Sequence, residues 1–152
     1  MNPKLLHNLS WIPMGIIGLS AIVLGVRWMV VQEPWLLDKA ANEAALGLTF
    51  NELFSADINK NLPDYLLIIY RFFGFWVTGI GLLVTAYILV TFMGTSKARN
   101  GLLAVLGPFI FGLLYLGHTK IPISPFIPMI YGLLILYCVS LCASVKLNKL
   151  EK

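Results

Sequence analysis

Charged residues are missing from four long stretches of this chain, and that pattern restricts what it can fold into. No Asp, Glu, Lys or Arg occurs in residues 5–26, 72–96, 100–119 or 121–145. A helix needs about 20 mainly apolar residues to cross a bilayer core about 30 Å thick. The backbone of a lipid-embedded stretch has no water to bond, so each stretch has to be helical. The pattern predicts four transmembrane helices, near residues 10–31, 65–93, 101–118 and 125–146.

Composition agrees with that prediction and excludes several other classes. Hydrophobic residues make up 59% of the 152 residues and charged residues 12%, about half the charged share of a soluble domain. Such a chain is neither disordered nor an ordinary cytosolic enzyme. The net charge of +4 does not indicate nucleic-acid binding, because the basic residues are scattered at segment ends. We expect an all-α integral membrane four-helix bundle, a single membrane domain over residues 1–152, with no nucleic acid among its partners.

The first apolar stretch is expected to remain as a membrane anchor. It follows Lys4 as a signal peptide would, but it is long and no small-x-small cleavage site follows Trp28. Orientation follows from Lys and Arg in the short loops, which favour the cytoplasmic side. The side of the two termini carries Lys4, Lys97, Arg99, Lys146, Lys149 and Lys152, and the other side carries Lys39, Lys60 and Lys120, with Arg27 and Arg71 at helix ends. We therefore expect both termini in the cytoplasm, most naturally of a bacterial inner membrane, and the 32–64 loop outside.

The 32–64 loop is predicted to contain an amphipathic helix. Residues 36, 37, 40, 41, 44, 45 and 48 are apolar and residues 38, 39, 42 and 43 are polar, a spacing that separates the two kinds on a helix. Pro34 suits its first turn and Gly47 its end. Thr49 and Glu52 form a capping-box pattern for a further short turn. This helix is either a lid on the membrane interface or the bundle mouth, or an ordered surface helix with no ligand role.

Small residues recur at helical spacing within the predicted spans. Helices in lipid pack through such residues, because small side chains let two backbones approach closely. We expect four inward faces, carried by Gly15, Gly18, Ile22 and Gly25; by Gly74, Thr78, Gly81 and Thr85; by Ala104, Gly107, Phe111 and Leu114; and by Ser124, Pro128, Tyr131, Ile135, Cys138 and Cys142. Packing alone explains nearly all of these positions.

Polar side chains continue those faces near the outer ends of the spans. Arg71 lies three residues before Gly74, and His118 follows Leu114 at helical spacing. Ionisable residues inside a bundle are costly, so they are candidates for function. We predict a ligand-binding layer formed by Arg71, His118, Tyr131, Tyr70 and Ser124. The alternative for Arg71 and His118 is contact with lipid head groups, while Asp64 is either a counter-ion in this layer or simply a helix cap.

Four other residues have structural interpretations. Arg27, beside Trp28, is expected to extend toward the head groups, and Trp28 is expected in the aromatic belt of the interface. Cys138 and Cys142 lie one helical turn apart, a geometry unsuited to a disulfide. No basic neighbour activates either thiol. We expect both cysteines to act as small packing residues.

The spans carry no pattern typical of a catalytic or metal site. The sequence has no serine elbow, phosphate loop, dinucleotide fingerprint or paired carboxylates within a span. His7 and His118 are expected on opposite sides of the membrane, so they cannot share a metal or a haem. We expect no catalytic residue, no metal and no cofactor other than a bound lipid or quinone. Such a protein is more naturally non-catalytic than an enzyme.

Residues 60–145 resemble a group of small membrane proteins. The second span reads Tyr70-Arg71-Phe72-Phe73-Gly74, the third ends Leu116-Gly117-His118-Thr119, and a Pro-containing link, Pro122 through Pro128, leads to Tyr131. This arrangement is similar to the DoxX-like four-helix membrane proteins, including members of unknown function. The resemblance implies a four-helix bundle with an outward-facing polar pocket, and in some relatives quinone-coupled oxidation or a role as a partner subunit. Of the family's positions only Arg71 carries over, because the family often has Arg where this chain has His118.

The function expected from these observations is binding of a lipid or quinone-like molecule by a non-catalytic membrane protein, in a pocket that faces outward. Two alternatives stay open. One is an accessory subunit docked on a larger membrane complex, and the other is a subunit of a quinone-linked oxidoreductase. The expected partners are membrane lipids, together with other membrane subunits or a second copy of the chain.

Overall fold

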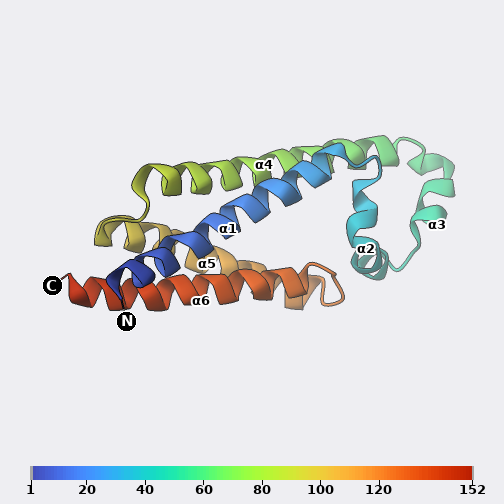
Figure 1. Ribbon diagram of the computed structural model, residues 1–152. Coiled ribbons are helices and arrows are strands. Elements are labelled where there is room, and N and C mark those ends of the chain that lie inside the picture. Colours follow the sequence, from blue (N-terminus) through green and yellow to red (C-terminus); the bar gives the residue numbers. More distant parts are fainter. Residues whose placement is uncertain (1, 152) are drawn as a thin grey trace.

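The computed structural model describes residues 2–151 and is helical throughout its length (Figure 1). The long helices are α1 (Pro3–Val30), α4 (Leu62–Thr91), α5 (Ser96–Lys120) and α6 (Ile127–Leu150). Between α1 and α4 lie η1 (Pro34–Asp38), α2 (Lys39–Leu46), α3 (Phe50–Ser55) and η2 (Asp57–Asn59). Four helices are long and apolar enough to cross a membrane. The four predicted spans are therefore confirmed as long apolar helices.

Polar capping residues extend these helices beyond their apolar stretches. The Asn2 side chain accepts a hydrogen bond from the Lys4 N–H at 2.9 Å, and α1 begins well before residue 10. The Thr95 hydroxyl accepts one from the Ala98 N–H at 3.2 Å, which starts α5 ahead of residue 101. Side-chain acceptors of this kind satisfy backbone N–H groups that a first helical turn leaves free. Apolar patterning marks where a helix crosses lipid, not where it begins.

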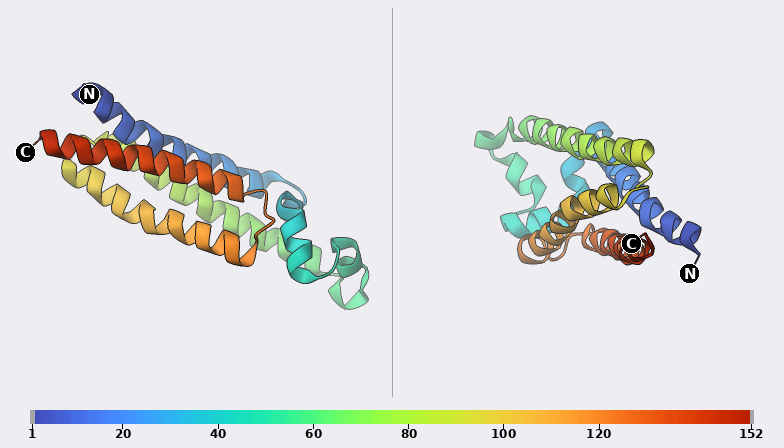
Figure 2. Two further views of the ribbon diagram at one scale, coloured as in Figure 1. Left: turned by 90° about the horizontal axis from the view of Figure 1, so that it is seen from below. Right: turned by 90° about the vertical axis from the view of Figure 1, so that its left-hand side faces the viewer.

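The first and last described residues lie at the same end of the bundle (Figure 1). We call this the terminal end, and we call the opposite end, which carries η1, α2, α3 and η2, the loop end. Every acidic residue except Glu151 lies at the loop end. Lys152, one of the basic residues counted above, lies outside the described residues. α1 packs along α4 on one side and α6 on the other, and α5 packs on α6 (Figure 2).

The contact between α1 and α4 is made by glycines that bring the two backbones together. A Cβ atom on Gly25 would lie 2.6 Å from the carbonyl oxygen of Gly74, and one on Gly81 would lie 2.7 Å from that of Gly18. Distances this short leave no room for any side chain. The small-residue faces predicted for these two helices are confirmed, except at Gly15, where a Cβ would meet nothing within 4 Å.

The faces predicted for α5 and α6 are wrong at most of their positions, and only Gly107 and Ser124 among them are buried. On α5 the buried side chains include Leu103 and Ile110, whereas Phe111 is 56% exposed. On α6 the buried residues are Tyr137, Ser140, Ala143, Ser144 and Leu147, and both cysteines are exposed. The outer face of a lipid-embedded helix is as apolar as its inner face, so apolar spacing does not tell them apart. The small residues that α1 meets on α6 include Ser140, whose hydroxyl donates to the Ser10 carbonyl, and Ala143, which packs on Leu6.

The hydrophobic core lies toward the terminal end. It joins side chains from all four long helices: Met14, Ile17, Val84, Ile88, Met93, Leu102, Leu103, Leu106, Ile110 and Tyr137. Between Ile127 and Leu136, in the loop-end half of α6, no residue is buried. The four helices are thus packed together at one end and less closely at the other.

The loop between α1 and α4 is itself folded. The rings of Trp35, Phe50 and Phe54 pack together, with centroids 5.5 to 6.4 Å apart. The predicted capping box is present, because the Thr49 hydroxyl accepts from the Glu52 N–H and the Glu52 carboxylate accepts from the Thr49 N–H. Hydrogen bonds from the Thr49 hydroxyl and N–H hold the pKa of Glu52 below its ordinary value of 4.5. α2 lies crosswise to the long helices (Figure 1).

Candidate functional site

Two hydrogen bonds tie this loop to helices on both sides of α1. The Ser124 hydroxyl, just before α6, donates to Asp38 Oδ2 at 3.0 Å. The Asn42 side-chain amide donates to the Tyr70 hydroxyl of α4, also at 3.0 Å. Asp38 and Ser124 are both buried. Two residues of the predicted ligand layer, Tyr70 and Ser124, therefore have partners from the loop.

His118 and Tyr131, two other residues of that layer, meet each other. The Tyr131 hydroxyl lies 2.9 Å from His118 Nε2, and His118 Nδ1 lies 3.0 Å from the Leu114 carbonyl oxygen. Because a carbonyl only accepts, Nδ1 carries a proton, and in the neutral imidazole Nε2 then accepts from the tyrosine hydroxyl. This pair links the end of α5 to the beginning of α6, and both side chains are exposed.

Arg71 lies apart from these contacts. Its side chain is exposed, although it continues the face of α4 that packs on α1. At this level the interior is filled by Trp28, which is buried and has ring centroids 4.9 Å from Phe73 and 5.3 Å from Phe126. Trp28, predicted in the aromatic belt of the interface, thus packs inside the bundle instead of facing outward. Since an indole occupies the space beside Gly74, the guanidinium of Arg71 is left outside.

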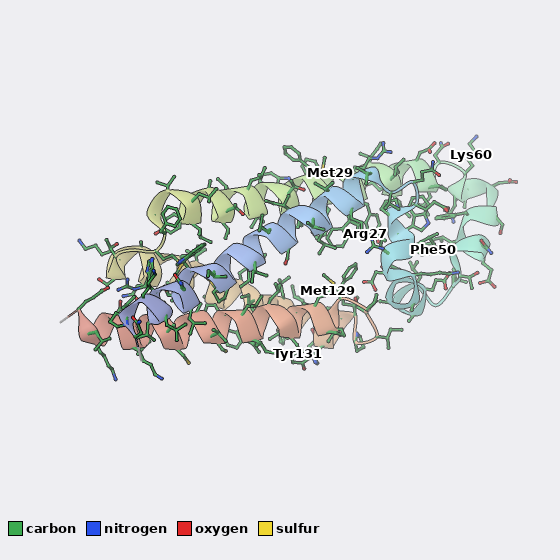
Figure 3. The ribbon with its side chains drawn as sticks, viewed as in Figure 1. Arg27, Met29, Phe50, Lys60, Met129 and Tyr131 are labelled. Atoms are coloured by element: carbon green, nitrogen blue, oxygen red, sulfur yellow. The ribbon has the colours of Figure 1, made fainter. Side chains whose placement is uncertain are left out.

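A groove with a different arginine lies between α1 and α6 toward the loop end. Its volume is about 360 Å³. It is lined by Phe126, which directly precedes α6, by Met129 of α6, and by six residues of α1: Ile16, Leu19, Ser20, Val23, Leu24 and Arg27. We call it the loop-end groove. Figure 3 shows Arg27 and Met129 on the facing sides of α1 and α6. Neither Arg71 nor His118 lines it.

The loop-end groove has one positive end and an otherwise mainly apolar lining. Ile16 and Arg27 are eleven residues apart, so the groove runs about 16 Å along α1, about half of a bilayer core. Arg27 occupies the end nearest the loop. Within residues 2–151 the ion pairs join Lys39 to Glu43 and Arg99 to Glu151, so no carboxylate there pairs with Arg27. The arrangement suits an amphiphile with an anionic head.

The sequence did not predict the burial of two charged residues, Arg99 and Asp38. Arg99, assigned to a loop, is fully buried at the terminal end, where it contacts Glu151, Asn148 and the Met93 carbonyl. Glu151 is the only acid at that end, and this was the sequence signal for its ion pair with Arg99. Asp38, assigned to the polar face of a surface helix, is 9% exposed. Its partner Ser124 is 86 residues away, so no local sequence pattern could predict the burial of Asp38.

The folded chain defines a class of protein, an integral membrane protein with four helices able to cross the bilayer. No family model, curated protein or solved structure matches the sequence. Within residues 2–151, no three His, Cys, Asp or Glu side chains gather as a metal site would require. The side chains along the contacts of α1 with α4 and with α6 are therefore the basis for assigning a function.

Proposed function

We propose that this protein is a non-catalytic membrane protein that binds an anionic phospholipid in the loop-end groove. The observation that carries the proposal is the position of Arg27 at one end of an otherwise mainly apolar trough between α1 and α6. A volume of about 360 Å³ falls within the usual range of about 300–1,000 Å³ for small-molecule sites.

The direction of the groove matches the direction of a lipid. Arg27 lies near the end of α1, at the membrane surface, and the lining continues through Val23 and Leu19 to Ile16, toward the middle of the span. A phospholipid in the leaflet on the loop side has its phosphate at the depth of Arg27. Its acyl chains lie at the depth of Val23, Leu19 and Ile16. A guanidinium binds a phosphate through two parallel hydrogen bonds, which adds specificity as well as affinity.

The loop supports the same proposal as a cover for this end of the bundle. Leu36, Leu46 and Leu48 are between 41% and 48% exposed, and α2 lies crosswise to the spans (Figure 1). Leu36 lies in η1, Leu46 in α2 and Leu48 in the turn after α2, and we propose that all three rest on the membrane interface. The excess of basic over acidic residues at the terminal end supports an orientation with both termini in the cytoplasm.

The experiment is native mass spectrometry of the protein released from lipid nanodiscs. The nanodiscs contain phosphatidylcholine with phosphatidylglycerol, which carries the negative charge. Arg27→Ala is expected to reduce retained phosphatidylglycerol about tenfold, since hydrogen bonds to charged groups contribute about 1.5–3 kcal/mol. Arg71→Ala is the matched control, because it removes an exposed arginine from the same end of the bundle without touching the groove.

The outcomes separate this proposal from its alternatives. Equal retention in wild type and Arg27→Ala contradicts the groove proposal. A loss in Arg71→Ala alone moves the site to the predicted layer of Arg71, Tyr70 and His118. Retention of quinone in place of phospholipid supports the quinone-linked role implied by the resemblance to DoxX-like proteins, and retained partner chains support the accessory subunit.

A further inference from the structure

A second groove lies at the terminal end, where α6 ends beside the start of α1. It is lined by Leu9 of α1 and by Cys138, Val139, Cys142, Ala143 and Lys146 of α6, with a volume of about 330 Å³. We call it the terminal-end groove. It runs beside the contact between Ser10 and Ser140, where the two helices touch. On the terminal side of this contact the two helices continue to pack through Leu6, Ala143 and Leu147, and the groove lies beside that packing.

Lys146 supplies the only charge in this groove. Cys138 is eight residues before it, so the apolar lining extends about 12 Å from Lys146 toward the middle of the membrane. Lys146 itself lies in the last turns of α6, near the membrane surface. The two grooves thus have the same make-up, a mainly apolar lining with one cation at its end. The cation of the terminal-end groove lies at the opposite end of the bundle from Arg27.

The one acid at the terminal end does not compensate Lys146. Glu151 pairs with the buried guanidinium of Arg99. Lys4, Lys97 and Lys149 add further positive charge at this end. A mainly apolar groove that opens among uncompensated cations is complementary to an anionic amphiphile, because the phosphate finds positive charge and the acyl chain finds an apolar lining.

We propose that the terminal-end groove binds a second anionic phospholipid, drawn from the leaflet on the terminal side. Its phosphate contacts the Lys146 ammonium, and one acyl chain lies along Val139 and Cys142. This site is separate from the one proposed above, since no residue lines both grooves. It also accounts for two cysteines that face outward on α6, where the lipid chain covers them.

Counting bound lipids by native mass spectrometry in phosphatidylglycerol nanodiscs tests this inference. Wild type is expected to retain two phosphatidylglycerol molecules, Lys146→Gln one, Arg27→Ala one, and the double variant none. The ammonium near a membrane surface contributes about 1 kcal/mol, so Lys146→Gln is expected to weaken its site about fivefold. Lys149→Gln is the matched control from the same helix end, outside the groove. Equal loss in Lys149→Gln, or no loss in either variant, overturns the inference.

Thiol accessibility gives a second readout. In phosphatidylglycerol vesicles, Cys142 of wild type is expected to react with a membrane-permeant maleimide several-fold more slowly than in phosphatidylcholine vesicles. Cys138→Ser isolates the Cys142 signal. Lys146→Gln is expected to abolish the difference, and Arg27→Ala to leave it intact. Reaction rates that do not depend on lipid in wild type contradict the terminal-end site and leave the loop-end site untouched.

Discussion

The two sides of α1 show opposite ways of packing a helix in lipid. Toward α4, glycines bring the backbones so close that an added Cβ on Gly25 would lie 2.6 Å from the Gly74 carbonyl oxygen. Toward α6, the Ser140 hydroxyl donates to the Ser10 carbonyl and Leu6 packs on Ala143 and Leu147, while grooves of about 360 and 330 Å³ remain along the seam. We call the tightly packed contact between α1 and α4 the closed seam. We call the contact between α1 and α6, with its two grooves, the open seam.

Together with the proposed lipid sites, this difference places stability and binding in separate parts of the molecule. In lipid there is little hydrophobic drive between helices, so a tight seam depends on van der Waals contact between close backbones. The α1–α4 seam has that contact along its length. The α1–α6 seam has less of this backbone contact. Each of its two grooves has a cation at the end nearer the helix terminus. We therefore expect substitutions in the first seam to change folding and substitutions in the second to change lipid binding.

The largest expected effect comes from adding one methyl group to the closed seam. Gly25→Ala places a Cβ against the backbone of α4, and overpacking of this kind costs about 1–3 kcal/mol. Gly79→Ala, where a Cβ meets nothing within 4 Å, is the control, and it gains helix propensity. Unfolding in detergent followed by circular dichroism measures both. A Gly25→Ala protein as stable as Gly79→Ala contradicts the closed seam.

A much larger addition to the open seam is expected to leave folding unchanged. Ser20→Phe fills part of the loop-end groove while keeping Arg27 in place. We expect a free energy of unfolding within about 0.5 kcal/mol of wild type, and retention of phosphatidylglycerol reduced about tenfold. Native mass spectrometry and the unfolding assay on the same preparation measure the two quantities. Full retention of the lipid in Ser20→Phe contradicts its place in the groove.

The smallest expected effect concerns the polar contact that joins the loop to the start of α6. Asp38 Oδ1 is buried without a hydrogen-bond partner in the described chain, so Ser124→Ala leaves the other carboxylate oxygen unpartnered as well. The loss is expected to be about 1 kcal/mol, and Ser124→Thr, which keeps a hydroxyl, is expected to retain most of it. Hydrogen exchange at the backbone amides of α2 reports the change. Unchanged exchange in Ser124→Ala would mean that this contact does not hold the loop.

The sequence predicted the spans and the closed seam, but not the open one. Charges mark span ends, and glycines at helical spacing on α1 and α4 have no cause other than close packing. On α6 the inward residues are Ser140 and Ser144, while the outward Cys138 and Cys142 have the same spacing and similar size. Choosing between such faces requires the position of a neighbouring helix. The same holds for Arg27, whose proposed role rests on the groove that it lines together with Met129 across the seam.

Photo-crosslinking tests the central claim, that the open seam binds lipid, most directly. The protein is placed in nanodiscs with a phosphatidylglycerol analogue that carries a diazirine on its acyl chain, and the crosslinked positions are mapped by mass spectrometry. We predict crosslinks concentrated at Ile16 to Leu24 of α1 and at Met129 of α6, and lost in Arg27→Ala. Crosslinks spread over the exposed face of α4, at Phe75, Trp76 and Leu83, and unaffected by Arg27→Ala, would contradict the account.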